Sequence, residues 1–374
     1  MKIGILTLPL HTNYGGILQA YALQTVLERM GHNVKVINYP LYIQRHIFRR
    51  FLSFLYRNLR KWILLDKKTN TSWITEYDVI CCQRGLTNKF ILQKIHNRFT
   101  DSLSKIKESE FDIIVVGSDQ VWRKNYSSWS NIRDQFLQFA KNWNIKKVSY
   151  AASFGKDKID DYTDNEISDI KGLLRSFQKI TVREESGIGI CEHFFQTNAI
   201  RLVDPTLLLS VDDYNQIIKE SGGSKYDGNL LVFVLDDRKE ISEFINDTEG
   251  CSDFKSFRLN GFDCRMDGSK YKNHALISVG QWLQTFRDAD AVVTDSYHAC
   301  IFSIIYNKPF IVFGNPNRGL SRYETLLNET GLSNRLILSR EDAIKKQHLL
   351  YQKPNAMGSL KDIKNKSLDF LREI

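Results

Sequence analysis

Residues 2–39, KIGILTLPLHTNYGGILQAYALQTVLERMGHNVKVINY, decide the fold class. The apolar run from Lys2 to Leu8 predicts a buried strand, and a polar loop from His11 to Gly16 follows it. Apolar side chains then recur at nearly helical spacing, and Gly31 stands at a helix C-cap position. Residues 33–39 predict a second strand. Strand, helix and strand in this order form a βαβ unit, so the two strands should be parallel.

The same alternation returns along the rest of the chain. Residues 288–314 repeat it in full, with strand, loop, helix and strand. Two successive α/β segments predict two Rossmann-like domains that face a cleft, with bounds 1–208 and 209–374. An insertion at about 41–110 interrupts the first domain, and a terminal helix over 360–374 can pack back on it. Further strands are predicted within 111–122, 146–155, 179–187 and 229–235.

The composition of the 374 residues is that of a globular protein, 42% hydrophobic and 25% charged. No apolar run reaches the roughly 20 residues that a membrane helix needs, and the N-terminus lacks signal-peptide features. The six cysteines are scattered, which indicates free thiols in a reducing compartment instead of a disulfide frame or zinc site. We therefore expect a cytoplasmic protein, and nothing in the sequence requires a metal.

Residues 41–68 stand out because they contain eight basic side chains but only one acidic side chain, Asp66, and aromatic residues are interleaved among them. Such a stretch can lie at an anionic membrane surface, which would make the protein peripheral at the cytoplasmic face. It can equally pack on the first domain with its charges in water. The net charge of +9 comes with no nucleic-acid-binding module, so we expect no nucleic acid partner.

The segment 294–300, TDSYHAC, carries the most chemistry. It lies between an apolar strand and an apolar helix, where the strand ends of a parallel sheet open onto a ligand cleft. A helix N-terminus favours anions, which makes Ser296 at its start a candidate binding residue, and His298 can donate or accept a proton near neutral pH. In the structural alternative, Asp295 or Ser296 caps the helix and hydrogen bonds hold His298.

Three arginines are placed to bind an anion. Arg183 ends a strand, and Arg318 and Arg322 follow a later one. Guanidinium groups bind carboxylate and phosphate oxygens in a bidentate way, so arginines from both domains suit a small, multiply charged anion. In the alternative, Arg183 pairs with Glu184 or Glu185 and the other two lie in solvent.

Three loops at strand ends, residues 11–16, 117–119 and 153–155, are expected to line the cleft, although the last two can also serve only as caps and turns. The first matches neither G-x-G-x-x-G nor a P-loop, which disfavours a nicotinamide or P-loop nucleotide site. The candidates in these loops are Asn13, Gly15, Gly16, Ser118 and Asp119.

The chain resembles the polysaccharide pyruvyl transferase family in the order and spacing of six stretches: MKIGILT…NYGGILQAYALQ, FDIIVVGSDQVW, KKVSYAASFG, ITVREESG, LVDPTLLL and VVTDSYHACIFSIIYNKPFI. The similarity runs from Met1 to about Leu338 and is weakest over 41–110. It implies a glycosyltransferase-B-like pair of domains. It also implies transfer of pyruvate from phosphoenolpyruvate to a sugar of a surface polysaccharide or its precursor, as a ketal and without a metal or other cofactor.

The resemblance also implies roles for single residues. The histidine of the family's S-x-H-type motif falls on His298, as general acid, and the arginine of the strand-end VR motif falls on Arg183. A downstream donor contact falls on Arg322 or Arg318, and the spacing favours Arg322. The implied partners are phosphoenolpyruvate and a glycan acceptor that can be lipid-linked. Two alternatives stay open: a glycosyltransferase that uses a nucleotide sugar on the same scaffold, and a non-catalytic glycan- or membrane-binding protein.

Overall fold

The computed structural model describes residues 1–39, 54–56, 58–59, 62–63, 76–126, 131–236, 238–260 and 277–374. Most of the basic stretch 41–68 lies outside this part, so the expected membrane contact falls largely beyond the described residues. Within the described ranges, none of the helices has both the length and the apolar character needed to span a membrane.

The first half of the chain builds a parallel sheet in the order β3-β2-β1-β4-β5. A short parallel pair, β6-β7, lies beside β5 through single-residue bridges. The parallel pairing of β1 with β2 confirms the predicted βαβ unit. The strands are β1 (Lys2–Leu6), β2 (Asn33–Asn38), β3 (Asn97–Phe99), β4 (Ile113–Val116), β5 (Lys146–Ser149), β6 (Thr181–Val182) and β7 (Ile200–Arg201).

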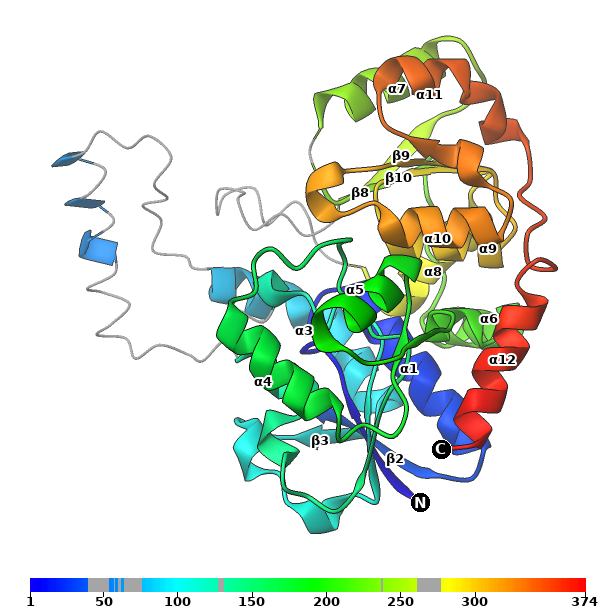
Figure 1. Cartoon of the computed structure of the whole chain (residues 1–374). Coiled ribbons are helices and arrows are strands. Elements are labelled where there is room, and N and C mark those ends of the chain that lie inside the picture. Colours follow the sequence, from blue (N-terminus) through cyan, green and yellow to red (C-terminus); the bar gives the residue numbers. More distant parts are fainter. Residues whose placement is uncertain are drawn as a thin grey trace.

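The second half builds another parallel sheet, in the order β12-β11-β10-β8-β9. The two sheets with their helices form separate α/β lobes (Figure 1), which confirms the predicted fold class. The strands are β8 (Leu230–Val234), β9 (Ser256–Asn260), β10 (Ala291–Thr294), β11 (Phe310–Phe313) and β12 (Leu336–Ile337).

Helices cover the sheets because successive strand residues point to opposite faces. Ile3 and Ile5 of β1 join a core that also contains residues of α1, α8 and α9, whereas Leu6 joins a second core with α4 and α5. The helices are α1 (Tyr14–Arg29), α3 (Glu76–Lys94), α4 (Asp164–Leu174), α5 (Glu185–Phe195), α6 (Val211–Glu220), α7 (Lys239–Gly250), α8 (Val279–Asp288), α9 (Tyr297–Ile305), α10 (Ser321–Glu329), α11 (Arg340–Lys345) and α12 (Lys361–Arg372).

The two lobes share apolar contacts on one side. Tyr14 of α1 stacks on Trp282 of α8 with ring centroids 5.2 Å apart, and its hydroxyl donates to the carbonyl of Ile277 at 2.7 Å. The chain then returns to the first lobe through α12, which ends near the N-terminus (Figure 1). Phe370 of α12 lies 6.1 Å from Tyr150, centroid to centroid.

Candidate active site

Residues that follow strands of both sheets meet in one place. β1 and β4 are neighbours at the switch point of the first sheet, and β8 and β10 are neighbours at that of the second. Ligands of open α/β sheets bind beyond the carboxyl ends of strands at such points. Ser118 and Asp119 follow β4, and His298 follows β10.

The start of α1 packs directly against His298. The sequence suggested a loop through Gly16, but the helix already begins at Tyr14 because the Asn13 side chain caps it and accepts the N–H of Gly16 at 3.1 Å. A Cβ added at Gly15 would lie 2.1 Å from Nδ1 of His298, so only glycine lets the imidazole approach this closely. Two segments almost 300 residues apart thus form one surface.

His298 lies in the first turn of α9, and 10% of its side chain is exposed. Its Nε2 lies 3.5 Å from Oδ2 of Asp204 but makes no hydrogen bond within the described part of the chain. Ser296 caps α9, accepting the N–H of Ala299 at 3.5 Å, as the structural alternative predicted. The cap fixes where the helix begins and thereby where the imidazole stands.

Asp204 is the buried centre of the cluster. Its Oδ2 accepts hydrogen bonds from Arg183 Nη1 at 2.8 Å and from Ser118 Oγ at 3.3 Å. Its Oδ1 accepts from the N–H and hydroxyl of Thr206 at 3.0 and 2.7 Å. Burial alone would raise the pKa of Asp204, but His298, Arg183 and Thr206 together hold it well below the usual range. The carboxylate is therefore ionised beside the imidazole.

Arg183 and Arg322 face the same aromatic ring from different lobes. Their guanidinium carbons lie 4.6 and 5.6 Å from the centroid of the Tyr297 ring. Both side chains are buried, and Arg183 Nε, Arg183 Nη2 and Arg322 Nε have no hydrogen-bond partner among the described residues. Arg183 is thus paired mainly with Asp204, because Glu184 Oε2 is 4.0 Å from Nε.

Arg318 is engaged inside its own lobe, where Nη2 donates to Asp236 Oδ1 at 2.6 Å. Its carbonyl accepts from Arg123 Nη1 of the first lobe at 3.0 Å, which joins the two lobes over the site. Burial lowers the pKa of Arg123, and Arg322 and Arg318 lower it further. Of the two downstream arginines, Arg322 is therefore the one with a buried, unpartnered donor.

Asp119 adopts a backbone conformation with φ of +74°, which few side chains tolerate. Its Oδ1 accepts the N–H of Gln120 at 2.9 Å, a local bond that stabilises the turn. The other oxygen, Oδ2, would lie 3.2 Å from a Cβ added at Gly16. Asp119 therefore lies against the start of α1, beside the residues that contact His298.

Asp295, three residues before His298, supports the second lobe. It accepts the N–H groups of Leu235 and Asp236 at 2.6 and 3.1 Å. Burial raises the pKa of Asp295 to about 6, although the two N–H groups and Arg318 act in the opposite direction and lower this pKa. This carboxyl therefore titrates close to neutral pH.

We expect Gly15→Ala to inactivate the site. Alanine normally stabilises a helix by about 0.5–1 kcal/mol over glycine, but here its methyl group would overlap the imidazole. The variant should lose activity and about 1–3 kcal/mol of unfolding free energy, measured by urea denaturation. Gly172→Ala in α4 is the control, because a Cβ there meets nothing within 4 Å. Equal stability of the two variants would contradict the close contact.

A match to a known protein family covers most of the chain. A profile of the family described as "Polysaccharide pyruvyl transferase" matches residues 13–317, which include His298, Arg183 and Asp204. The chain belongs to this family. The resemblance inferred from the six sequence stretches is thereby confirmed, and the family implies a transferase that acts in polysaccharide biosynthesis on a polysaccharide acceptor. No curated protein sequence matches the chain.

Solved structures show that this family member shares the glycosyltransferase-B fold. A UDP-GlcNAc 2-epimerase of Neisseria meningitidis is similar at TM-score 0.51 and 10% identity, over 100% of both chains. The epimerase of Methanocaldococcus jannaschii is similar at TM-score 0.51 and 16% identity, over 99% of both. The S. aureus MnaA–UDP structure gives TM-score 0.51 and 12% identity, over 100% of this chain and 98% of its own.

The structure thus gathers most of the candidates predicted for this pyruvyl transferase family member, including His298 and Arg183, although their roles stay predictions. Sequence reasoning did not single out three other members of the cluster: Asp204, Tyr297 and Arg123. Asp204 had a usable signal, since it follows a strand end and precedes a proline. Within the described ranges, no group of three His, Cys, Asp or Glu side chains is arranged to hold a metal ion.

Proposed function

We propose that the protein transfers the pyruvyl group of phosphoenolpyruvate to two hydroxyls of a surface glycan or its precursor, forming a ketal and releasing phosphate. One observation carries the proposal: Arg183 and Arg322 present buried, unpartnered N–H donors around Tyr297. The His298 ring makes a T-shaped contact with the Tyr297 ring, with the two ring centroids 5.5 Å apart.

Unpartnered buried donors cost about 1–3 kcal/mol each, and more when charged, so their presence favours a ligand that satisfies them. Phosphoenolpyruvate has a carboxylate and a phosphate, two groups that guanidinium forks bind well. Asp204 neutralises part of the charge of Arg183. Arg322, by contrast, pairs with no carboxylate among the described residues and donates only to the carbonyl of Arg318. The cluster therefore suits an anion with two acidic groups.

The geometry supports an acid-base role for His298. Nε2 makes no hydrogen bond, so its proton is available to the methylene carbon of the donor. Protonation gives an oxocarbenium-like centre at C2, which one sugar hydroxyl attacks while the imidazole recovers a proton from it. The second hydroxyl then displaces phosphate, and its proton leaves with the phosphate. Arg183 and Arg322 stabilise the departing phosphate, and ionised Asp204 keeps the ring oriented.

The donor reaches the cluster when the two lobes separate. His298, Arg183 and Arg322 are 8%, 3% and 6% exposed, so the described conformation is a closed one. Opening must break the polar contacts between the lobes, which include the hydrogen bonds from Arg123 to the carbonyls of Arg318 and Asn317 and the ion pair of Arg201 with Glu329. Lobe closure then excludes water from the reacting centre.

The test is incubation with phosphoenolpyruvate and a panel of nitrophenyl and lipid-linked glycosides. We expect phosphate release that depends on both substrates, and a product heavier by the pyruvyl ketal in mass spectra. The alternative function, a glycosyltransferase or other nucleotide-sugar enzyme, draws on the UDP-GlcNAc and UDP named in the structures of similar fold. Nucleotide release from a sugar nucleotide, with no use of phosphoenolpyruvate, would establish it and overturn the proposal.

A further inference from the structure

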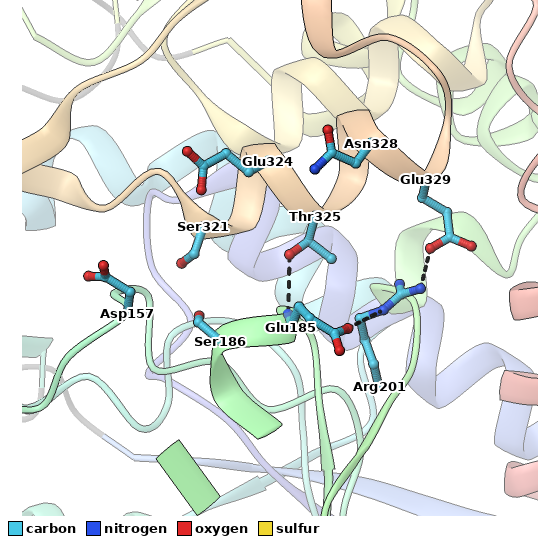
Figure 2. Close-up of a pocket in the computed structure, with 9 residues that line it drawn as sticks. All are labelled: Asp157, Glu185, Ser186, Arg201, Ser321, Glu324, Thr325, Asn328 and Glu329. Atoms are coloured by element: carbon cyan, nitrogen blue, oxygen red, sulfur yellow. Dashed lines mark hydrogen bonds and ion pairs between the residues drawn. The ribbon is translucent and has the colours of Figure 1, made fainter. Parts of the chain in front are cut away.

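A cavity opens between the lobes, beside the segments that carry Arg183 and Arg322. It has a volume of about 370 Å³ and is lined from both sides, by the start of α5 and by α10 (Figure 2). Its lining residues Ser186 and Ser321 lie close in sequence to Arg183 and Arg322. Each wall of the cavity therefore belongs to a segment that also carries an arginine of the proposed donor site.

The charged side chains that line the cavity are mainly acidic, whereas the proposed donor site presents the guanidinium groups of arginines. Its lining includes four carboxylates against the single guanidinium of Arg201. Arg201 pairs with Glu185 at 3.3 Å and also with Glu329. The carboxylates of Asp157 and Glu324 have no ion-pair or hydrogen-bond partner among the described residues. An anionic ligand would be repelled here, so phosphoenolpyruvate does not belong in this cavity.

Two hydroxyls in the cavity are unsatisfied. Ser321 is 8% exposed, and its Oγ, like that of Ser186, is buried without a partner in the described structure. Figure 2 shows the two side chains extending into the space between α10 and α5. Buried hydroxyls without partners are rare in proteins, and a ligand with hydroxyls of its own would satisfy them.

We propose that this cavity is the acceptor site and that it takes a hydroxyl-rich sugar ring without negative charge, neutral or amine-bearing. The inference rests on the proposed function, since it places the acceptor beside the donor. Free carboxylates accept hydrogen bonds from sugar hydroxyls or an ammonium group, and serine hydroxyls both donate and accept. Asp157 and Glu324 lie on opposite lobes, so an acceptor bound to both holds the lobes together over the donor.

The test measures binding of nitrophenyl glycosides by saturation-transfer NMR titration: a neutral glucoside and galactoside, an unacetylated glucosaminide, and a glucuronide. Wild type should bind a neutral or amino glycoside at least 10-fold more tightly than the glucuronide. Tightest binding by the glucosaminide would show an ammonium group between the free carboxylates, whereas preference for a neutral ring would show hydroxyl recognition. Equal or tighter binding of the glucuronide, or no binding in the panel, would overturn the proposal.

Two variants locate the binding. Ser321→Ala should weaken glycoside binding by about 2- to 12-fold and leave the melting temperature unchanged or higher, because the lost hydroxyl has no protein partner. Glu324→Ala should weaken it by about 10-fold. The control is Glu192→Gln, an exposed residue of α5 that does not line the cavity. Unchanged glycoside affinity in both variants would contradict the site.

The same variants separate this inference from the proposed function. Phosphoenolpyruvate affinity, measured by calorimetry, should stay within about twofold of wild type in Ser321→Ala and Glu324→Ala, since neither residue belongs to the arginine cluster. A wild-type protein that binds glycosides but not phosphoenolpyruvate would refute the proposed function and leave the sugar site intact. Loss of both ligands in the variants would refute the separate acceptor site.

Discussion

His298→Ala should reduce turnover by about 10²–10⁴-fold, the usual contribution of a positioned acid-base group. The imidazole supplies the proton in the proposed reaction, and it lies 3.5 Å from Asp204 and against Gly15. Phosphate release at saturating phosphoenolpyruvate measures the loss. Because Arg183 still neutralises Asp204, the variant should keep its fold and its phosphoenolpyruvate affinity.

The control for this prediction is His193→Ala. His193 is exposed on α5 and stacks edge-on against Phe194, so its removal should leave turnover unchanged. Circular dichroism and the melting temperature show whether His298→Ala remains folded. A folded variant that turns over at nearly the wild-type rate would eliminate His298 as the acid.

Arg183→Met should abolish donor binding and also destabilise the protein. The side chain is 3% exposed and donates to Asp204 at 2.8 Å, so its loss leaves a buried carboxylate without its cation. Breaking a buried pair in this way costs about 3–5 kcal/mol. Urea denaturation gives the stability, and calorimetry with phosphoenolpyruvate gives the binding.

The double variant Arg183→Met/Asp204→Asn separates the two effects. Removing the carboxylate charge as well should recover a large part of the lost stability, because neither partner is then left as an isolated buried ion. Donor binding should remain lost, since the guanidinium beside Tyr297 is still absent. Recovery of phosphoenolpyruvate binding in the double variant would show that Arg183 only balances Asp204.

The elements of the fold could be predicted because each carries a local pattern. The strand runs ending near Leu6, Val116 and Thr294 are apolar and short, and polar or glycine residues follow them. Since parallel strands place their carboxyl ends along one edge, His298 and Arg183 could be expected near one cleft. The start of α1 was misplaced because two glycines have low helix propensity, whereas the Asn13 cap and packing against His298 outweigh that preference.

The rest of the site depends on contacts between distant segments, which no local pattern encodes. Asp204 belongs to the site only because the chain after β7 lies close to the start of α9, which places the carboxylate beside His298. Arg123 reaches Arg318 across nearly 200 positions of chain. The acceptor cavity likewise needs α5 and α10 to face each other, and its serines have no distinguishing sequence context.

The Tyr14–Trp282 stack lies in the hydrophobic core that spans both lobes, whereas the bridge from Arg123 is polar. Breaking the aromatic stack exposes large apolar faces to water, whereas breaking the Arg123 bridge exchanges its two hydrogen bonds for others with solvent. We therefore expect the aromatic contact to persist when the polar contacts between the lobes open.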